Sequence, residues 1–326
     1  MSVPIVLIGH PETRPLLSEL GRLGLGAPSL TLAPLPNVLP VEALVPRDVD
    51  FDKLVAINGS GTHHHETLPL VLGRLLRRDR LSYVQIDAHP DLGPPGPQVT
   101  CGSFVGELLT EPRIDTVTLL GQYPPCVLAE HYPTVYTDHL GEFGSEYFRK
   151  LRKYLVEPSD LAEVYWPFRS RDLELARANP SVRDARVVRR APPKIRNPHT
   201  TPAPPPEPTL VVDWRTVDEL MVDELTADSV AEGPLYLSID LDVARTRPIT
   251  DWKREETTEN QGNMEWPALI ELIRRIARTR RVVAADVCGL TSDFESLPVS
   301  LRTDSLHAVG EVIEELVRAV EGSDEL

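Results

Sequence analysis

Cysteine and long apolar runs are both scarce in this sequence, and each scarcity excludes a class of protein. The three cysteines, Cys101, Cys126 and Cys288, are far apart and form no CxxC pair, which argues against a zinc ribbon or a redox motif. No apolar stretch approaches the length of a membrane span, and the amino terminus lacks the basic region of an export signal. We therefore expect a protein of the reducing cytoplasm that does not insert into membranes.

Basic residues are also scarce relative to acidic residues. Lys and Arg total 34 against 49 Asp and Glu, which gives a formal net charge of −15. This balance opposes binding to nucleic acid or anionic lipid and favours a cationic substrate. The hydrophobic content of 41% over 326 residues is nevertheless sufficient for a substantial core.

Short apolar or β-branched runs recur along the chain, most of them without strict alternation of polar residues. Such runs are typical of strands buried on both faces, and the clearest are VPIVLIG, KLVAIN, LSYVQID, GPLYLSID and RRVVAAD. Helical patterns lie between several of them, as in ETLPLVLGRLLRR, WPALIELIRRIART and TDSLHAVGEVIEELVRAV. This alternation predicts an α/β fold with a mostly parallel central sheet.

A stretch rich in proline and arginine interrupts the pattern at about residues 179–208. We interpret it as a surface insertion, partly disordered, within a single domain that spans residues 1–326. Its basic residues are typical of a solvated loop, and a contact to an acidic partner is the alternative. A lid and a free loop are both compatible with this composition.

Acidic and imidazole side chains follow two of the predicted strands. In LSYVQIDAHPDLG, Asp87, His89 and Asp91 stand at alternating positions after an apolar run, and alternate residues of a strand point to the same side. Asp240 and Asp242 repeat this spacing in GPLYLSIDLDV. In such sheets, ligands usually bind outside the carboxyl ends of the strands. Because acidic pairs at the end of an apolar strand are costly without compensation, we favour a metal site over an Asp-rich turn or a helix cap.

A third cluster lies in NGSGTHHHETLPLV, where His63, His64 and His65 occupy a corner between a predicted strand and a helix that begins near Glu66. At least one of these histidines is expected to bind metal beside the acidic clusters. The combined donor set is rich in oxygen and has no thiolate, so it suits a pair of Mn²⁺ ions better than structural zinc. Two ions about 3.5–4 Å apart can lower the pKa of a shared water, which predicts a hydrolase.

These motifs resemble those of the arginase and agmatinase (ureohydrolase) superfamily. DAHPD is similar to the DAHxD motif, SIDLD to SxDxD, and GTHHHETLPLV to the agmatinase pattern GGDHSITLPLL, in a register that places the metal-binding histidine at His64. The resemblance extends from about Leu54 to the carboxyl terminus and leaves out the Pro/Arg-rich insertion. It implies a three-layer α-β-α arginase-like fold, two Mn²⁺ ions, hydrolysis of a guanidino group to urea and an amine, and a homo-oligomer.

The resemblance assigns six metal ligands, namely two bridging carboxylates and, on each ion, one histidine with one aspartate. In that order they are Asp87 and Asp240, then His64 with Asp91, then His89 with Asp242. Asp87 and His89 are therefore expected to act in catalysis. Cys101 stands where the family has a histidine shortly after DAHxD, so His65 or water becomes the candidate acid for the departing amine.

Within the superfamily, the sequence is more similar to a divergent arginase-like branch that includes peptide arginases, which convert arginine to ornithine inside peptides. The segments that carry this likeness are HHETLP, IDAHPDL, SFVGELL, SIDLDV and CGLTSDFESLP. The preferred substrate is therefore an arginine side chain within a peptide. A hydrolase of agmatine or an acylated polyamine is one alternative, and a metal-stabilised binding protein without turnover is another.

The sequence departs from the free-arginine enzymes at two places. Arg245 and Thr246 stand where those enzymes have Asp-Pro, and Gly289 stands where they carry a glutamate that pairs with guanidinium. Because a guanidinium needs a carboxylate partner, another acidic residue is expected to replace that glutamate. The candidates are Asp293, which we favour, Glu295 and Glu66. Asp286, at the end of RRVVAAD, is interpreted as structural.

Overall fold

The computed structural model describes residues 3–89, 91, 97–122, 151–156, 211–215, 233–244, 264–291 and 298–322. The Pro/Arg-rich stretch at about 179–208 lies outside these residues, and so do the two acidic candidates Asp293 and Glu295.

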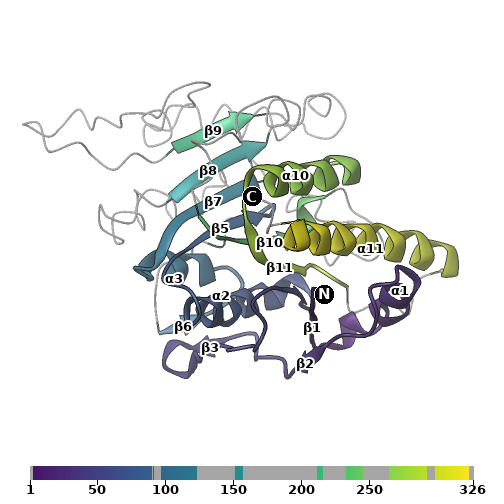
Figure 1. The fold of residues 1–326 in the computed structure, drawn as a ribbon, viewed down its shortest axis with the longest axis horizontal. Coiled ribbons are helices and arrows are strands. Elements are labelled where there is room, and N and C mark those ends of the chain that lie inside the picture. Colours follow the sequence, from purple (N-terminus) through teal and green to yellow (C-terminus); the bar gives the residue numbers. More distant parts are fainter. Residues whose placement is uncertain are drawn as a thin grey trace, which may run out of the picture.

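A nine-stranded sheet organises the described chain, in the order β2-β1-β4-β11-β10-β5-β7-β8-β9 (Figure 1). Every neighbouring pair in this sheet is parallel, as the uninterrupted apolar runs predicted. The strands are β1 (Ile5–Ile8), β2 (Leu30–Leu32), β4 (Leu54–Ile57), β5 (Leu81–Ile86), β7 (Ile114–Gln122), β8 (Leu151–Val156), β9 (Val211–Arg215), β10 (Leu235–Asp240) and β11 (Val282–Cys288). A separate antiparallel pair joins β3 (Leu39–Pro40) to β6 (Gln98–Val99).

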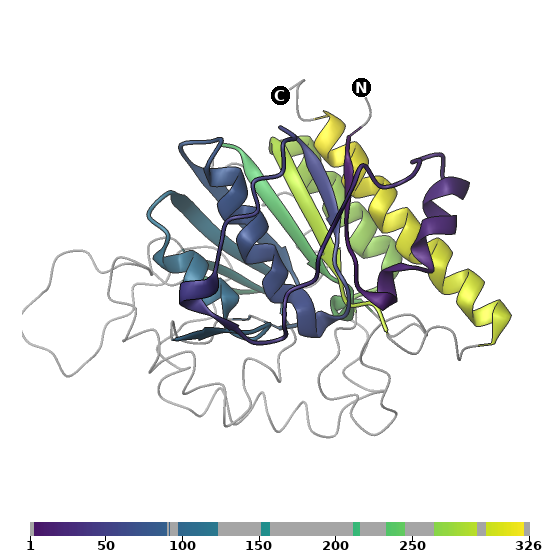
Figure 2. The ribbon, with the colours of Figure 1, turned by 90° about the horizontal axis from the view of Figure 1, so that it is seen from below.

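Helices cover both faces of the sheet, which makes three layers (Figure 2). The helices are α1 (Leu16–Arg22), α2 (Thr67–Leu75), α3 (Phe104–Thr110), α10 (Trp266–Thr279) and α11 (Val299–Glu321). One apolar core joins the sheet to α1, α10 and α11, and a second joins the opposite face to α2 and α3. The central strands β4, β5, β10 and β11 are buried along their whole length, so the predicted three-layer α/β fold is confirmed.

Short 3₁₀ helices connect several of these elements. They are η1 (Pro11–Thr13), η2 (Val41–Ala43), η3 (Gly61–Glu66) and η4 (Leu241–Val243). The predicted histidine corner is η3, which joins the end of β4 to α2. Among the described residues, no helix is both long and apolar enough to cross a membrane.

The backbone of the segment around Arg47 lies directly against α2. The Arg47 N–H donates to the Pro69 carbonyl of that helix at 2.8 Å, and the buried guanidinium of Arg74 donates to the Val49 carbonyl at 2.5 Å. At Gly73 the approach is closest, because a Cβ atom there would overlap the Arg47 carbonyl. The glycine is therefore required by the packing of backbone on backbone.

We predict that Gly73→Ala lowers the free energy of unfolding by about 1–3 kcal/mol, because the new methyl group must displace backbone rather than a mobile side chain. Urea denaturation would measure the change. Gly21→Ala in α1 is the matched control, since a Cβ there meets nothing within 4 Å, and it should be neutral or stabilising by up to about 1 kcal/mol. Equal effects of the two substitutions would contradict the packing argument.

Candidate metal centre

The three predicted clusters meet at the carboxyl ends of neighbouring strands. Asp87 directly follows β5, Asp240 is the last residue of β10, and His64 lies in η3, which follows β4. In the sheet these strands are adjacent apart from β11, which lies between β4 and β10. Parallel pairing therefore brings together side chains that are up to 178 residues apart in the chain, from His64 to Asp242.

His64 faces three carboxylates on one side of the centre. Its Nδ1 atom lies 3.1 Å from Oδ2 of Asp87, 3.0 Å from Oδ2 of Asp91 and 3.6 Å from Oδ2 of Asp240. All four side chains are buried, and within the described part of the chain this nitrogen has no hydrogen-bond partner in acceptable geometry. A lone pair surrounded by carboxylate oxygens is the arrangement that a divalent cation would complete.

The tautomer of His64 follows from its other nitrogen. Ser238 donates its single hydroxyl proton to Oδ1 of Asp286 at 2.6 Å, so it can only accept from Nε2 of His64, which lies 2.9 Å away. The Tyr236 hydroxyl donates to the second oxygen of Asp286 at 2.7 Å. This chain of hydrogen bonds keeps the proton of His64 on Nε2 and leaves Nδ1 available as a ligand. Asp286 is thus structural, as interpreted from the sequence, and acts on the centre through Ser238.

His89 forms the second side of the centre with Asp242 and Asp87. Its Nδ1 atom lies 2.7 Å from Oδ2 of Asp242 and 3.6 Å from Oδ1 of Asp87. Asp87 therefore presents one oxygen to each histidine, which is the geometry of a bridging carboxylate. Asp240 lies with His64, and its Oδ1 accepts from the Asp242 N–H at 3.0 Å.

Gln85 contacts the carboxylates of both Asp87 and Asp91. Its amide nitrogen lies 2.5 Å from Oδ2 of Asp87 and 3.2 Å from Oδ2 of Asp91, and its amide oxygen accepts from the Tyr83 hydroxyl at 3.0 Å. Asp91 has a positive φ of 50°, which is uncommon for a residue other than glycine. This backbone conformation accompanies the close approach of its carboxylate to His64.

Burial controls the ionisation of these groups in the absence of a cation. Burial and the neighbouring Asp87 raise the pKa of Asp91 to about 7, and burial raises the pKa of Asp242 to about 6. Burial also raises the pKa of Asp240 well above its ordinary value. Burial opposes ionisation of Asp87 too, but the adjacent imidazoles of His64 and His89 outweigh it and hold the Asp87 pKa far below normal. These buried carboxylates therefore fit a pair of divalent cations, whose positive charge would favour the ionised form of the side chains.

A thiol lies beside this set of carboxylate and imidazole donors, at a position that the sequence analysis did not include among the ligands. Cys288 is fully buried and its Sγ lies 3.3 Å from Oδ2 of Asp240. The ligand atoms of His64, Asp240 and Cys288 all lie within 4.8 Å of one another. In the sheet, Cys288 is paired with Asp240, and each is the last residue of its strand. Only knowledge that β10 and β11 are neighbours could have revealed it.

The backbone at Gly289 has no room for the glutamate that the resemblance aligns with this position. Its φ is +94°, and a Cβ atom there would overlap Oδ1 of Asp240 and lie 2.8 Å from the Leu241 nitrogen. Its N–H donates to the Gly59 carbonyl at 3.1 Å, which holds the turn against the loop after β4. This backbone path accepts glycine and excludes a larger side chain.

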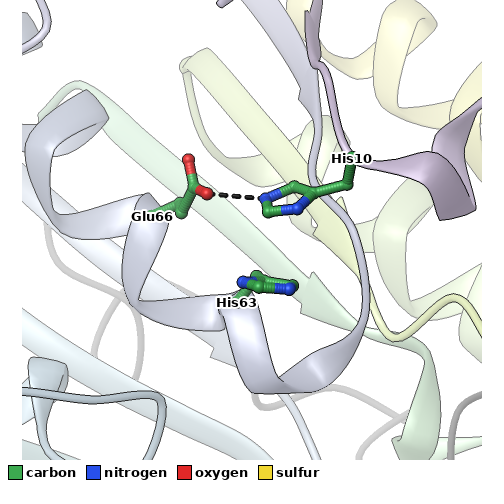
Figure 3. A group of neighbouring side chains, drawn as sticks. All are labelled: His10, His63 and Glu66. Carbon is green, nitrogen blue, oxygen red and sulfur yellow. Dashed lines mark hydrogen bonds and ion pairs between the residues drawn. The ribbon is translucent and has the colours of Figure 1, made fainter. Parts of the chain in front are cut away.

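Glu66 and His65 do not have the contacts expected of a substrate ligand and a proton donor. Both carboxylate oxygens of Glu66 are used within the protein. Oε1 lies 2.6 Å from Nε2 of His10 (Figure 3). Oε1 also accepts from the Leu35 N–H at 2.8 Å, and Oε2 accepts from Arg47 at 2.8 Å. His65 has no exposed surface, and its Nε2 lies 2.8 Å from the Pro36 carbonyl, to which it must donate. We therefore correct both assignments and regard the two side chains as anchors of η3.

The remaining candidates near the corner are His63 and Cys101. The ring of His63 stacks on that of His10 with centroids 3.8 Å apart, and it lies in a group with His10 and Glu66 that contains none of the aspartates around His64 (Figure 3). Burial lowers the pKa of His63 and raises that of Cys101 to about 11. Cys101 is partly exposed and belongs to none of the metal-binding groups found among the described residues.

We predict that Ser238→Ala weakens Mn²⁺ binding by about 10- to 100-fold, because His64 loses the acceptor that fixes its tautomer and orientation. Isothermal titration calorimetry would measure the affinity. Ser82→Ala is the matched control: Ser82 is also a buried serine of a central strand, but within the described chain its hydroxyl has no hydrogen-bond partner. An equal loss of affinity in both variants would contradict a specific role for Ser238.

We predict that Gly289→Ala lowers the free energy of unfolding by about 1–3 kcal/mol and also weakens metal binding, since its methyl group would displace the Asp240 carboxylate. Denaturation and metal titration of the same variant test the two effects. Gly102→Ala serves as the control, because a Cβ at Gly102 meets nothing within 4 Å. Unchanged metal affinity in Gly289→Ala would show that Asp240 does not depend on this turn.

Comparisons with known proteins give a fold and no sequence family. No family model matches the sequence, and no curated protein matches it. Proclavaminate amidino hydrolase from Streptomyces clavuligerus superposes with a TM-score of 0.52, 15% identity, and coverage of 99% of this chain and 93% of that chain. A Clostridium difficile structure described as a candidate agmatinase gives a TM-score of 0.51, 12% identity, and coverage of 99% and 98%.

At identities this low, the likeness concerns the fold alone. It agrees with the parallel sheet and the helical layers on its two faces. The chain therefore shares the three-layer α/β fold of these solved structures, which is the fold class that its sequence predicted.

Proposed function

We propose that this protein is a hydrolase with two Mn²⁺ ions that cleaves a guanidino group to urea and an amine. The observation that carries the proposal is the buried set of carboxylate and imidazole donors that meets in a fold shared with an amidino hydrolase. Of the four groups that could hold a metal among the described residues, one contains His64, Asp87 and Asp91, and another contains Asp87, His89 and Asp242. Asp87 belongs to both, which supports two ions that share a carboxylate.

The oxygen-rich donor set supports Mn²⁺, which prefers carboxylate and imidazole ligands. When bound, such a pair of ions supplies positive charge that lowers the pKa of water and stabilises the charge that develops on the substrate. The protein side chains prepare this site in advance. Ser238 keeps Nδ1 of His64 free, and Gln85 holds Asp87 and Asp91 in place.

The proposed reaction adds a water oxygen to the guanidino carbon and breaks the bond from that carbon to the substituted nitrogen. Urea and an amine result, and the departing amine must take up a proton. Because His65 is committed to the Pro36 carbonyl, we assign this proton to water at the site. Asp87 and His89 contribute to catalysis as ligands that position the reacting water.

An arginine side chain within a peptide is the substrate that we favour. The net charge of −15 favours a basic peptide, and Gly289 offers no carboxylate of the kind used by free-arginine enzymes. With Glu66 held by Arg47 and His10, Asp293 and Glu295 are the proposed partners of the guanidinium. Agmatine and acylated polyamines are the competing small substrates.

We predict that Mn²⁺-loaded protein releases urea from arginine-containing peptides, with less or none from free arginine and agmatine. A colorimetric urea assay with the three substrates in parallel would measure this. Asp87→Ala should abolish the activity, because the variant loses the shared carboxylate, and a chelator should abolish it until Mn²⁺ is restored. Asp115→Ala is the control, since it removes a carboxylate that pairs only with the surface residue Arg80 in the described contacts.

Each alternative predicts a different pattern of products. Urea from small molecules would indicate an ordinary arginase or agmatinase activity. Release of an amine from acylated polyamines without urea would indicate amide hydrolysis. Bound metal with no product from any substrate would contradict the proposal and favour a metal-stabilised binding protein.

A further inference from the structure

The thiol of Cys288 lies in polar surroundings that a core cysteine does not require. It ends β11 beside Asp240, the last residue of β10, and both strands run in the same direction. The side chain has no exposed surface, yet its sulfur contacts the Asp240 carboxylate at 3.3 Å. A buried cysteine commonly behaves as a small apolar residue, so its position among metal-binding groups calls for a specific explanation.

The distances around Cys288 match those between ligands of one metal ion. With a metal–sulfur bond of about 2.3 Å and a metal–oxygen bond of about 2.1 Å, an angle of about 100° separates the two ligand atoms by about 3.4 Å. The Sγ of Cys288 lies 3.3 Å from Oδ2 of Asp240. The 3.6 Å between that oxygen and Nδ1 of His64 corresponds to an angle of about 120° at bonds of about 2.1 Å. Sulfur, oxygen and nitrogen can therefore reach a single ion.

The opposite side of the centre contains no sulfur ligand among the described residues. There the ligand atoms come from Asp87, His89 and Asp242. The other cysteine of the described chain, Cys101, is partly exposed and belongs to none of the metal-binding groups. The two sides of the centre thus differ in the softness of their donors.

We infer that Cys288 binds, as a thiolate, the ion that His64 and Asp240 hold, and that this side of the centre prefers a thiophilic divalent metal such as Zn²⁺ or Co²⁺. The inference rests on the proposed two-ion centre and goes beyond it by adding a thiolate to the carboxylate and imidazole ligands, and it gives the side with His64 a preference for Zn²⁺ or Co²⁺ in place of the second Mn²⁺. Binding forms a metal–sulfur bond and breaks the S–H bond, and the proton passes to solvent. The side with His89 keeps its preference for Mn²⁺, because its donors are carboxylate and imidazole.

Cobalt provides a direct test, because a cobalt–thiolate bond produces a charge-transfer band in the near ultraviolet that carboxylate and imidazole ligands do not. We expect the Co²⁺-loaded protein to show this band. Cys288→Ser should lose the band while still binding Co²⁺ through its remaining ligands. Cys101→Ser is the matched control and should retain the band.

Affinity gives a second readout that does not depend on turnover. Cys288→Ser should weaken the tighter Zn²⁺ site by at least about 10-fold, while Mn²⁺ affinity on the side of His89 stays within about threefold. Competition titrations on the full chain would measure both constants, and circular dichroism would check that the variant is folded. Equal losses for the two metals would overturn the assigned preference.

The zinc-loaded double variant Cys101→Ser/Cys126→Ser, which retains Cys288 as the one cysteine of the sequence, keeps the inference testable even if Cys288→Ser does not fold. X-ray absorption at the zinc edge should detect sulfur at about 2.3 Å from the metal. Binding without a cobalt–thiolate band, or without zinc–sulfur scattering, would overturn the role of Cys288 and leave the two-ion centre intact. Failure of the wild-type chain to bind any of the three metals would instead overturn the centre itself, and this inference with it.

Discussion

Repulsion among the buried carboxylates at the ends of β5 and β10 is the constraint on which the centre depends. Four aspartates that are mostly inaccessible to water lie within a few ångströms of two histidines. Burial raises the pKa of Asp91 to about 7 and that of Asp242 to about 6, which shows that this environment disfavours the ionised carboxylates. A fold that places these groups together is stable in their charged form only when a positive charge is also bound.

The support for the centre comes from polar residues in the interior of the sheet. Tyr236, Ser238 and Asp286 lie on β10 and β11, and Tyr83 and Gln85 lie on β5. Their hydrogen bonds run from the apolar core toward the strand ends and finish on His64 and on Asp87. Because Asp286 takes the hydroxyl proton of Ser238, Ser238 accepts from Nε2 of His64 and Nδ1 of that ring is left free to bind a metal. These hydrogen bonds hold the side chains of His64 and Asp87 in fixed positions relative to the buried sheet.

The three adjacent histidines show how one short element serves three purposes. In a 3₁₀ helix successive side chains point about 120° apart, so neighbours in the sequence face different surroundings. His64 faces the carboxylates, His65 reaches the Pro36 carbonyl, and His63 stacks on His10. Glu66, with Arg47 and His10, holds the end of the same element. The corner is therefore an anchored part of the metal centre rather than a mobile loop.

The sequence by itself determined the layer architecture and the metal-binding motifs, because both depend on local patterns. Uninterrupted apolar runs such as residues 81–86 predict parallel strands buried on both faces, and alternation after a strand places Asp87, His89 and Asp91 at its end. Only the tertiary structure decided which other side chains join them. Cys288 reaches the centre because β11 lies beside β10, and Glu66 is withdrawn from it because His10 and Arg47 approach from distant segments. Strand order and the approach of distant segments arise from packing across the whole sheet, which no local pattern of residues encodes.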